Sequence, residues 1–121
     1  MGGLSPERDV SIVTGNSVVE ALKRKGLITL PIQVDHQIGE TLQSNPIDLA
    51  FIALHGTFGE DGCIQGLLEY FKIPYTGSGV MGSALAYDKL KSKEILKSHG
   101  IPTADYEVFY RNQKEKISRS L

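Results

Sequence analysis

Apolar residues recur with helical spacing near the start of this chain. A helix is predicted over 8–25, with Ser5 as its N-cap and Gly26 as the residue that ends it. Basic residues just before Gly26 favour this end, because cations stabilise the negative C-terminal end of a helix. The apolar positions are expected to share one face of the helix: Val10, Val13, Val18, Ala21 and Leu22.

Other apolar stretches have the character of strands. Residues 27–34 are predicted to form one strand, and 49–54 form an uninterrupted apolar run between polar residues. Uninterrupted runs are typical of strands that are buried on both faces, as in a parallel sheet. Shorter strands are predicted at 74–76 and 106–110.

Between and after these strands the pattern returns to helices. Helices are predicted at 63–71, 80–87 and 89–98; 35–46 has room for a short one, and Asn112 is the expected cap of a last one. This alternation predicts an α/β domain with an open parallel sheet. Such a domain usually begins with a strand, whereas this sequence begins with the loop that would follow one.

Composition and charge narrow the class of protein. The chain has 121 residues, a length that suits one domain, and 40% of them are hydrophobic. The net charge of −1 argues against a basic surface for nucleic acid, and no apolar run approaches the ~18 residues of a membrane span. The single cysteine, Cys63, excludes an internal disulfide and is expected to be a small buried residue. We therefore expect a cytoplasmic protein that binds neither nucleic acid nor membrane.

Two loops are candidates for a ligand site, because ligands of open parallel sheets gather at the carboxyl ends of the strands. Glu7, in the loop near the start, either complements a helix dipole or faces the cleft to hold an ammonium group or transfer a proton. His55 follows the apolar run 49–54 and is either a satisfied core histidine or a functional one, which donates to a substrate carboxylate or orients Glu7. Both interpretations of each residue remain open at this point.

Further polar residues carry weaker signals. Glu60 and Asp61 are able to bind a metal, but adjacent acids before a helix more often stabilise its N-terminus. Lys89 opens a lysine-rich helix, which is either a solvated face or a source of one phosphate contact. The glycine-rich loop 55–62 matches neither the dinucleotide fingerprint nor a P-loop, so no nucleotide motif identifies the chain.

Several segments in order resemble the N-terminal region of D-alanine–D-alanine ligases. They are GGLSPERDVS (2–11), the run from Ala53 to Gly62 with its ALHG and GEDG blocks, IQGLLE (64–69), IPYTGSGV (73–80) and SALAYDK (83–89). The resemblance covers roughly 1–110. It implies an ATP-grasp enzyme in which ATP phosphorylates one D-alanine and the amine of a second attacks, giving the dipeptide used in peptidoglycan.

The resemblance also implies an architecture and roles. It assigns 1–100 to a pre-ATP-grasp (flavodoxin-like) domain with its first strand missing, and 101–121 to the start of a truncated central domain. Glu7, our candidate catalytic residue, resembles the glutamate that holds the ammonium of the first D-alanine. His55 resembles the histidine near that substrate's carboxylate, and Lys89 resembles a lysine on the ATP side of the cleft.

This sequence departs from the family pattern in ways that affect the expected metal ligands, activity, stability and assembly. Family members are much longer, and the domains that supply most ATP contacts and the Mg²⁺ ligands have no counterpart here, so we expect no metal ligands in this chain. Thr57 and Cys63 stand where arginine and threonine are frequent. We expect a chain that is inactive alone and marginally stable or strand-sharing, with a homodimer as its assembly. The alternatives are a non-catalytic remnant or dimerisation module, and a related ligase with another acceptor such as D-lactate.

Overall fold

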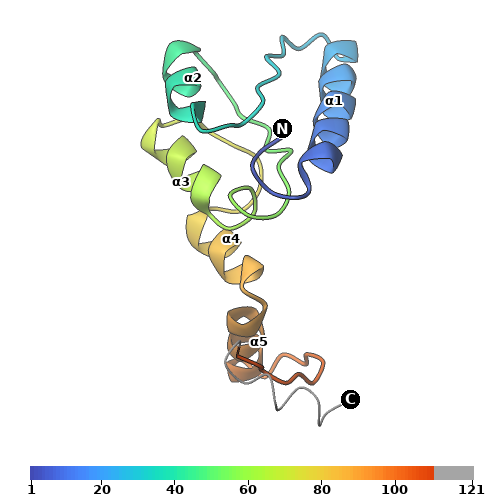
Figure 1. The fold of residues 1–121 in the computed structure, drawn as a ribbon, viewed down its shortest axis with the longest axis vertical. Helices are drawn as coiled ribbons and strands as arrows, with labels where there is room; N and C mark the ends of the chain where they lie inside the picture. Colours follow the sequence, from blue (N-terminus) through green and yellow to red (C-terminus); the bar gives the residue numbers. More distant parts are fainter. Residues whose placement is uncertain (111–121) are drawn as a thin grey trace. The chain divides into compact units, whose positions relative to one another are not determined.

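The computed structural model describes residues 1–110 and divides the chain into two compact units, 1–88 and 89–121. Figure 1 shows the helices of the described part in chain order, which are α1 (Arg8–Arg24), α2 (Ile38–Ser44), α3 (Cys63–Tyr70), α4 (Val80–Tyr87) and α5 (Lys89–Ser98). The helices predicted at 8–25, 63–71, 80–87 and 89–98 are confirmed to within one residue, and α2 lies in the polar stretch 35–46. The helix predicted after Asn112 lies outside the described residues.

The predicted strands are present only as extended segments, because no described residue belongs to a regular strand. Two isolated parallel bridges join these segments, one between Gly2 and Val34 and the other between Ala50 and Tyr75. Residues 106–110 have no regular structure. The open parallel sheet is therefore not formed as a ladder, although the pairing that exists runs in the predicted parallel sense.

Each bridge is built from alternating backbone hydrogen bonds. The N–H of Val34 donates to the carbonyl of Met1 at 2.9 Å, and the N–H of Gly3 donates back to Val34 at 3.2 Å. On the other side, Ala50 donates to Pro74 at 2.8 Å and accepts from Thr76 at 3.0 Å. The backbone N–H and C=O groups of Ile32 and Val34 thus point toward the start of the chain. Those of Ala50 point away from it, toward 74–76.

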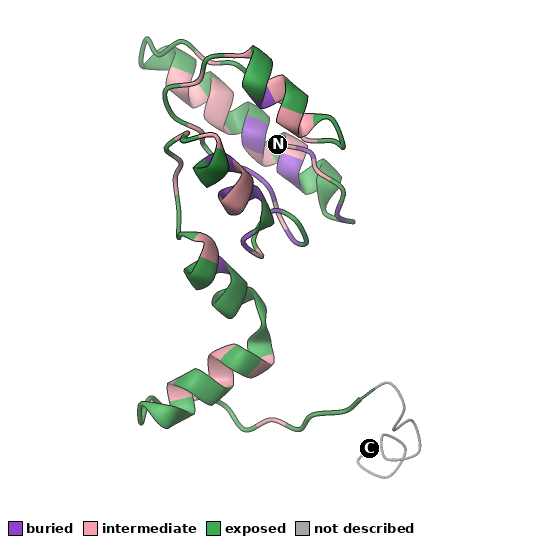
Figure 2. Ribbon diagram, turned by 90° about the vertical axis from the view of Figure 1, so that its left-hand side faces the viewer, coloured by how far each residue is buried: buried purple, intermediate pink, exposed green. Residues whose placement is uncertain are grey.

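The hydrophobic core lies between these extended segments and two helices. Leu42 of α2, Leu54 at the end of the apolar run, and Ile64 and Leu68 of α3 are buried together. Partly buried residues pack against them: Ile32, Val34, Ile38, Ile47, Ala50, Ile52, Leu67, Phe71, Ile73 and Tyr75. Figures 1 and 2 show α1 on the other side of the extended segments and most of α4 exposed. Burial of this apolar surface is what holds α2 and α3 in place.

The buried face of α1 differs from the predicted one. Val10 and Val13 are 60% and 67% exposed, and the buried residues of the helix are Ser11 and Gly15. The reason is the close approach of the chain start, since a methyl group on Gly15 would lie 2.5 Å from the Cβ of Met1. Only small residues fit at such a contact, so hydrophobic periodicity alone selects the wrong face.

Ser11 joins three segments through one hydroxyl group. This fully buried side chain accepts a hydrogen bond from the N–H of Gly2 at 2.8 Å and donates one to the carbonyl of Ala53 at 2.5 Å. It thereby connects α1, the chain start and the end of the apolar run. Because both backbone partners are buried beside it, loss of the hydroxyl would leave them unpaired.

The second unit is described by itself. In it the ammonium group of Lys93 donates to Thr103 and to the carbonyl of Ala104, and it lies 5.2 Å from the centre of the Tyr106 ring. Lys97 lies 4.6 Å from the same ring centre. Among the helices of 1–110, none is both long and apolar enough to cross a membrane.

Ser11→Ala is expected to destabilise the chain by about 2 kcal/mol, because it leaves a buried donor and a buried acceptor without partners. Urea denaturation followed by circular dichroism measures the change. Ser17→Ala is the matched control on the same helix, since the Ser17 hydroxyl is exposed and only donates to the carbonyl of Val13. Equal stability of the two variants would show that the Ser11 bridge does not hold these segments together.

Candidate functional site

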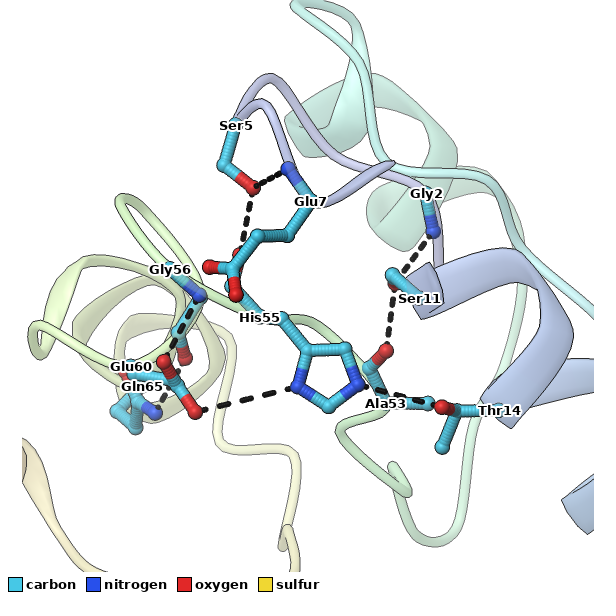
Figure 3. A network of polar contacts seen from close by, with 11 residues as sticks. Gly2, Ser5, Glu7, Ser11, Thr14, Ala53, His55, Gly56, Glu60 and Gln65 are labelled. Carbon is cyan, nitrogen blue, oxygen red and sulfur yellow. Dashed lines mark hydrogen bonds and ion pairs between the residues drawn. The ribbon is translucent and has the colours of Figure 1, made fainter. Parts of the chain in front are cut away.

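The loop before α1 is fixed by the hydroxyl of Ser5, which is not the helix N-cap that the sequence predicts. The helix begins at Arg8 and Glu7 occupies the cap position. The Ser5 hydroxyl accepts from the N–H of Glu7 at 3.2 Å and donates to the carbonyl of His55 at 2.7 Å (Figure 3). A serine that was expected to start a helix therefore ties two loops together that lie fifty residues apart in the chain.

Glu7 and His55 consequently lie on neighbouring loops, the loop before α1 and the loop 55–62. We call the edge of the first unit where these two loops meet the rim. The Glu7 carboxylate is against Gly56, where an added methyl group would lie 2.5 Å from Oε2. Gly56 also has a φ of 71°, which side chains other than glycine rarely adopt. Glycine is needed at this position for both reasons, and its lack of a side chain lets the Glu7 carboxylate approach the backbone beside His55 (Figure 3).

The imidazole of His55 has a polar group near each nitrogen. The Thr14 hydroxyl lies 3.2 Å from Nε2, and Glu60 Oε1 lies 4.0 Å from Nδ1. The other oxygen of Glu60 accepts from the N–H of Gly56 at 2.8 Å, so this carboxylate is anchored to the loop (Figure 3). His55 is half-buried, with 31% of its side chain exposed. The contacts hold the ring from both ends while leaving part of it accessible.

Asp61 stabilises the end of the glycine-rich loop and the start of α3, as expected for an acid before a helix. It accepts hydrogen bonds from the N–H of Phe58 at 2.8 Å and from that of Cys63 at 3.1 Å. Burial alone would raise the pKa of Asp61, but these N–H groups and the Cys63 thiol lower it below its ordinary value. Phe58 needs this support, because its φ of 64° is unfavourable for a non-glycine residue.

Cys63 is exposed, which corrects the expectation that it is buried. It is the first residue of α3, where the neighbouring Ile64 enters the core and Cys63 does not. The hydrogen bond to Asp61, together with desolvation and the negative charge of that carboxylate, raises the pKa of the Cys63 thiol. A thiol with a raised pKa is a poor nucleophile at neutral pH, so no catalytic role is assigned to it.

A cavity of about 400 Å³ opens beside this rim. Its lining includes Leu4 from the first loop, His36 before α2, and His55, Phe58 and Cys63 from the second loop and α3. Two further contacts hold the middle of the second loop: Thr57 hydrogen bonds to the Tyr87 hydroxyl at 2.9 Å, and Gln65 donates to the carbonyl of Gly59 at 3.0 Å. The cavity is large enough for a small molecule such as an amino acid.

Lys89 belongs to the second unit, where it is the first residue of α5. It lines a smaller cavity of about 250 Å³ together with Lys93 and Tyr106. Within residues 1–110 there is no cluster of three or more His, Cys, Asp or Glu residues arranged to hold a metal ion. Glu60 and Asp61, the acids considered for that purpose, are instead engaged by backbone N–H groups.

The sequence predicts that Glu7 and His55 lie together at the rim, but it does not predict most of the residues that hold them there. No sequence motif marks Thr14 or the hydrogen bonds of Ser5. Ser11 and Gly15 do leave a signal, because two small residues one turn apart indicate a close approach to the helix. Glu60 was considered only as a metal ligand or a helix-stabilising acid, and its contact with His55 depends on the fold of the loop.

Comparison with known proteins shows what this chain is similar to. Residues 36–78 match the family model described as D-ala D-ala ligase N-terminus. The chain is therefore similar to the N-terminal region of D-alanine–D-alanine ligases, which confirms the resemblance seen in the sequence.

Individual relatives of the chain are named D-alanine–D-alanine ligase. The chain is 56% identical over 108 residues to the D-alanine–D-alanine ligase of Carboxydothermus hydrogenoformans, a match that covers 89% of this chain and 35% of the relative. It is 49% identical over 121 residues to that of Citrifermentans bemidjiense, covering 100% of this chain and 40% of the relative. A crystal structure of the Bacillus anthracis ligase complexed with ATP has a TM-score of 0.78 and 38% identity, covering 97% of this chain and 42% of that one. The chain thus spans well under half the length of these relatives.

Asp61→Asn is expected to destabilise the chain by about 1 kcal/mol at neutral pH, which is less than for a buried charged acceptor because Asp61 is partly exposed. Its folded pKa is lowered, so the contribution is present above the unfolded pKa and is lost as the pH falls through the folded pKa. Urea denaturation over a pH series should show the difference between the two chains narrowing in acid. Asp48→Asn, at an exposed position, is the control. A difference that does not depend on pH would contradict the assignment.

Proposed function

We propose that this chain is the D-alanine-binding part of a D-alanine–D-alanine ligase, an ATP-dependent enzyme that joins two D-alanine molecules for peptidoglycan synthesis. The observation that carries the proposal is the Ser5 hydroxyl, which links the N–H of Glu7 to the carbonyl of His55 and so places both residues at one rim. The names of the relatives support the reaction class.

The two side chains suit the two ends of a small zwitterion. In the proposed site the Glu7 carboxylate holds the ammonium of the first D-alanine, and the His55 imidazole donates to its carboxylate. Glu60 and Thr14 support this role because they fix the ring that must donate. Holding the substrate in one orientation contributes to catalysis by positioning, which is the role that we assign to this part of the enzyme.

The open parallel sheet and the domain boundaries are part of the proposal. In the proposed order, 32–34 lies beside 1–3, which is followed by 50–54 and then 74–76; the two parallel bridges and the Ser11 link support this order. We keep 1–100 as a pre-ATP-grasp, flavodoxin-like domain and 101–121 as the start of a central ATP-grasp domain. The two compact units of the structure divide the chain earlier, between Asp88 and Lys89.

ATP and Mg²⁺ would be held mainly by parts of the enzyme outside this chain. Lys89 is proposed to contact the ATP phosphates, since a lysine ammonium is a suitable partner for phosphate. The described residues offer no cluster for Mg²⁺, so no step is assigned to the metal here. We also propose a cytoplasmic location and a homodimer; the exposed Val10 and Val13 on α1 support an association surface.

This chain by itself is expected to release no phosphate from ATP in the presence of Mg²⁺ and D-alanine. The reason is that this chain covers only 35% and 40% of two ligase relatives, and phosphoryl transfer depends on metal and phosphate contacts that we assign mainly to the rest of the enzyme. A coupled phosphate assay measures this, with the Carboxydothermus hydrogenoformans ligase as positive control. Turnover that follows the purified chain through a second chromatographic step would refute the expectation.

Glu7→Gln is best tested in a chimera, in which this chain replaces the matched part of the Carboxydothermus hydrogenoformans ligase and all other residues of the relative are kept. Loss of the negative charge should raise the KM for D-alanine by about 10-fold or more, because a hydrogen bond to a charged group is worth about 1.5–3 kcal/mol. Glu20→Gln is the matched control on α1, since Glu20 contacts only Lys23 at the surface. Unchanged D-alanine kinetics in the Glu7 variant would remove this residue from the site.

A further inference from the structure

The loop 55–62 keeps one residue in an unfavourable backbone conformation. Phe58 has a φ of 64°, in the left-handed region that non-glycine residues rarely adopt. Its N–H donates to the Asp61 carboxylate at 2.8 Å, within the same loop, and Phe58 is 52% exposed. A strained conformation persists only where the surrounding structure holds it. Contacts made by the neighbours of Phe58 therefore decide whether the loop keeps this shape.

Helix α4 contacts the loop on both sides of Phe58 along the chain. After Phe58, Gly62 packs so closely against the start of α4 that an added methyl group would lie 2.9 Å from the carbonyl oxygen of Val80. Before Phe58, the Thr57 hydroxyl lies 2.9 Å from the hydroxyl of Tyr87, the last residue of α4. A helix of 8 residues is about 12 Å long, so these contacts are well separated along it. α4 thus supports the loop at two points.

The contact between the two hydroxyls holds the middle of the loop from outside. Among the residues that the structure describes, it is the one hydrogen bond that joins Thr57 or Phe58 to a residue beyond the loop. Both residues line the cavity of about 400 Å³, as does His55. A change in the shape of the loop at this point would therefore move the cavity wall beside the imidazole.

We propose that Thr57 and Tyr87 are a positioning pair for the candidate site. Their hydroxyl contact holds the middle of the loop 55–62 against α4 and keeps Phe58 in its strained conformation. It thereby keeps the cavity wall and His55 in the arrangement that binds D-alanine. Neither side chain touches the reacting atoms, and both act through the loop. The inference deepens the proposed function and rests on it for the identity of the substrate.

The effect of this pair is local, because the contact is made at the surface. Thr57 is exposed and Tyr87 is 39% exposed, so each hydroxyl bonds to water once its partner is removed. The contact therefore adds little to the stability of the whole first unit. Its loss is measurable instead in the exchange of the Phe58 amide and in the binding of the substrate.

The first experiment measures solvent exchange of the Phe58 amide by NMR in this chain. Thr57→Val and Tyr87→Phe each remove one hydroxyl and keep the shape of the side chain. Each is expected to speed this exchange by about 3-fold, the size of effect expected for loss of one neutral hydrogen bond at the surface. The double variant should show no further increase, because either single change already removes the whole contact. The amides of α3 should keep their rates in every variant.

Two control variants separate the hydroxyl contact from other effects. Thr57→Ser keeps the hydroxyl and is expected to retain the exchange rate of the parent chain. Tyr70→Phe removes the hydroxyl of a tyrosine on α3 that is 81% exposed, and it should leave the exchange of the Phe58 amide unchanged.

The second experiment places the same variants in the chimera with the Carboxydothermus hydrogenoformans ligase. Thr57→Val, Tyr87→Phe and the double variant are each expected to raise the KM for D-alanine by about 3-fold. The KM for ATP should stay unchanged, and Thr57→Ser should restore the KM of the parent chimera. A pair that only stabilised the fold would not change the KM for one substrate alone.

Three results would contradict the proposal. They are a Phe58 amide that exchanges at the same rate in all variants, effects of the two single variants that multiply in the double variant, and faster exchange with an unchanged KM for D-alanine in a chimera whose KM responds to Glu7→Gln. If Glu7→Gln also leaves that KM unchanged, the proposed substrate site is wrong. The exchange measurement, which uses no substrate, then decides separately whether the pair holds the loop.

Discussion

Two serine hydroxyls hold the described first unit in the arrangement on which its candidate site depends. The fully buried Ser11 joins α1 to Gly2 and Ala53. Ser5, in the loop before α1, joins that loop to His55. Both bridges connect the start of the chain to residues at the end of the apolar run 49–54, Ala53 and the following His55. With no regular strand ladder among the described residues, these bridges and two isolated parallel pairings fix the relative position of the segments. A single hydroxyl that serves as donor and acceptor is well suited to this task, because it satisfies two buried backbone groups at once.

The site follows from this constraint. Once Ser5 has brought the two loops together, the Glu7 carboxylate lies against Gly56 and the imidazole of His55 is close to Thr14 and Glu60. His55 lines the cavity of about 400 Å³ beside this rim, and an acid and an imidazole here would suit the small zwitterionic substrate that we propose. The similarity to D-alanine–D-alanine ligases and the geometry therefore point to the same proposed ligand from separate directions.

Local signals predicted the helices well, whereas contacts between distant segments decided the features that the sequence did not predict. The bounds of α3, α4 and α5 follow from caps, glycines and periodicity, all of which are local. The buried face of α1 was predicted at Val10 and Val13 but lies at Ser11 and Gly15, because residues 1–3 approach the helix too closely for larger side chains. The meeting of Glu7 and His55 was predictable from the rule that ligand sites lie at the carboxyl ends of parallel strands. The Ser5 and Glu60 contacts were not, since they depend on how two loops fold against each other.

The central claim, that Ser5 brings the loop of Glu7 onto the loop of His55, is tested most directly by nuclear Overhauser effects in the free chain. A methyl group placed on Gly56 would lie 3.2 Å from the Cβ of Ser5, so the β-protons of Ser5 and the α-protons of Gly56 are close neighbours. The account predicts strong cross-peaks between these protons in solution. Their absence from a spectrum that resolves both residues, with the helices intact, would contradict it.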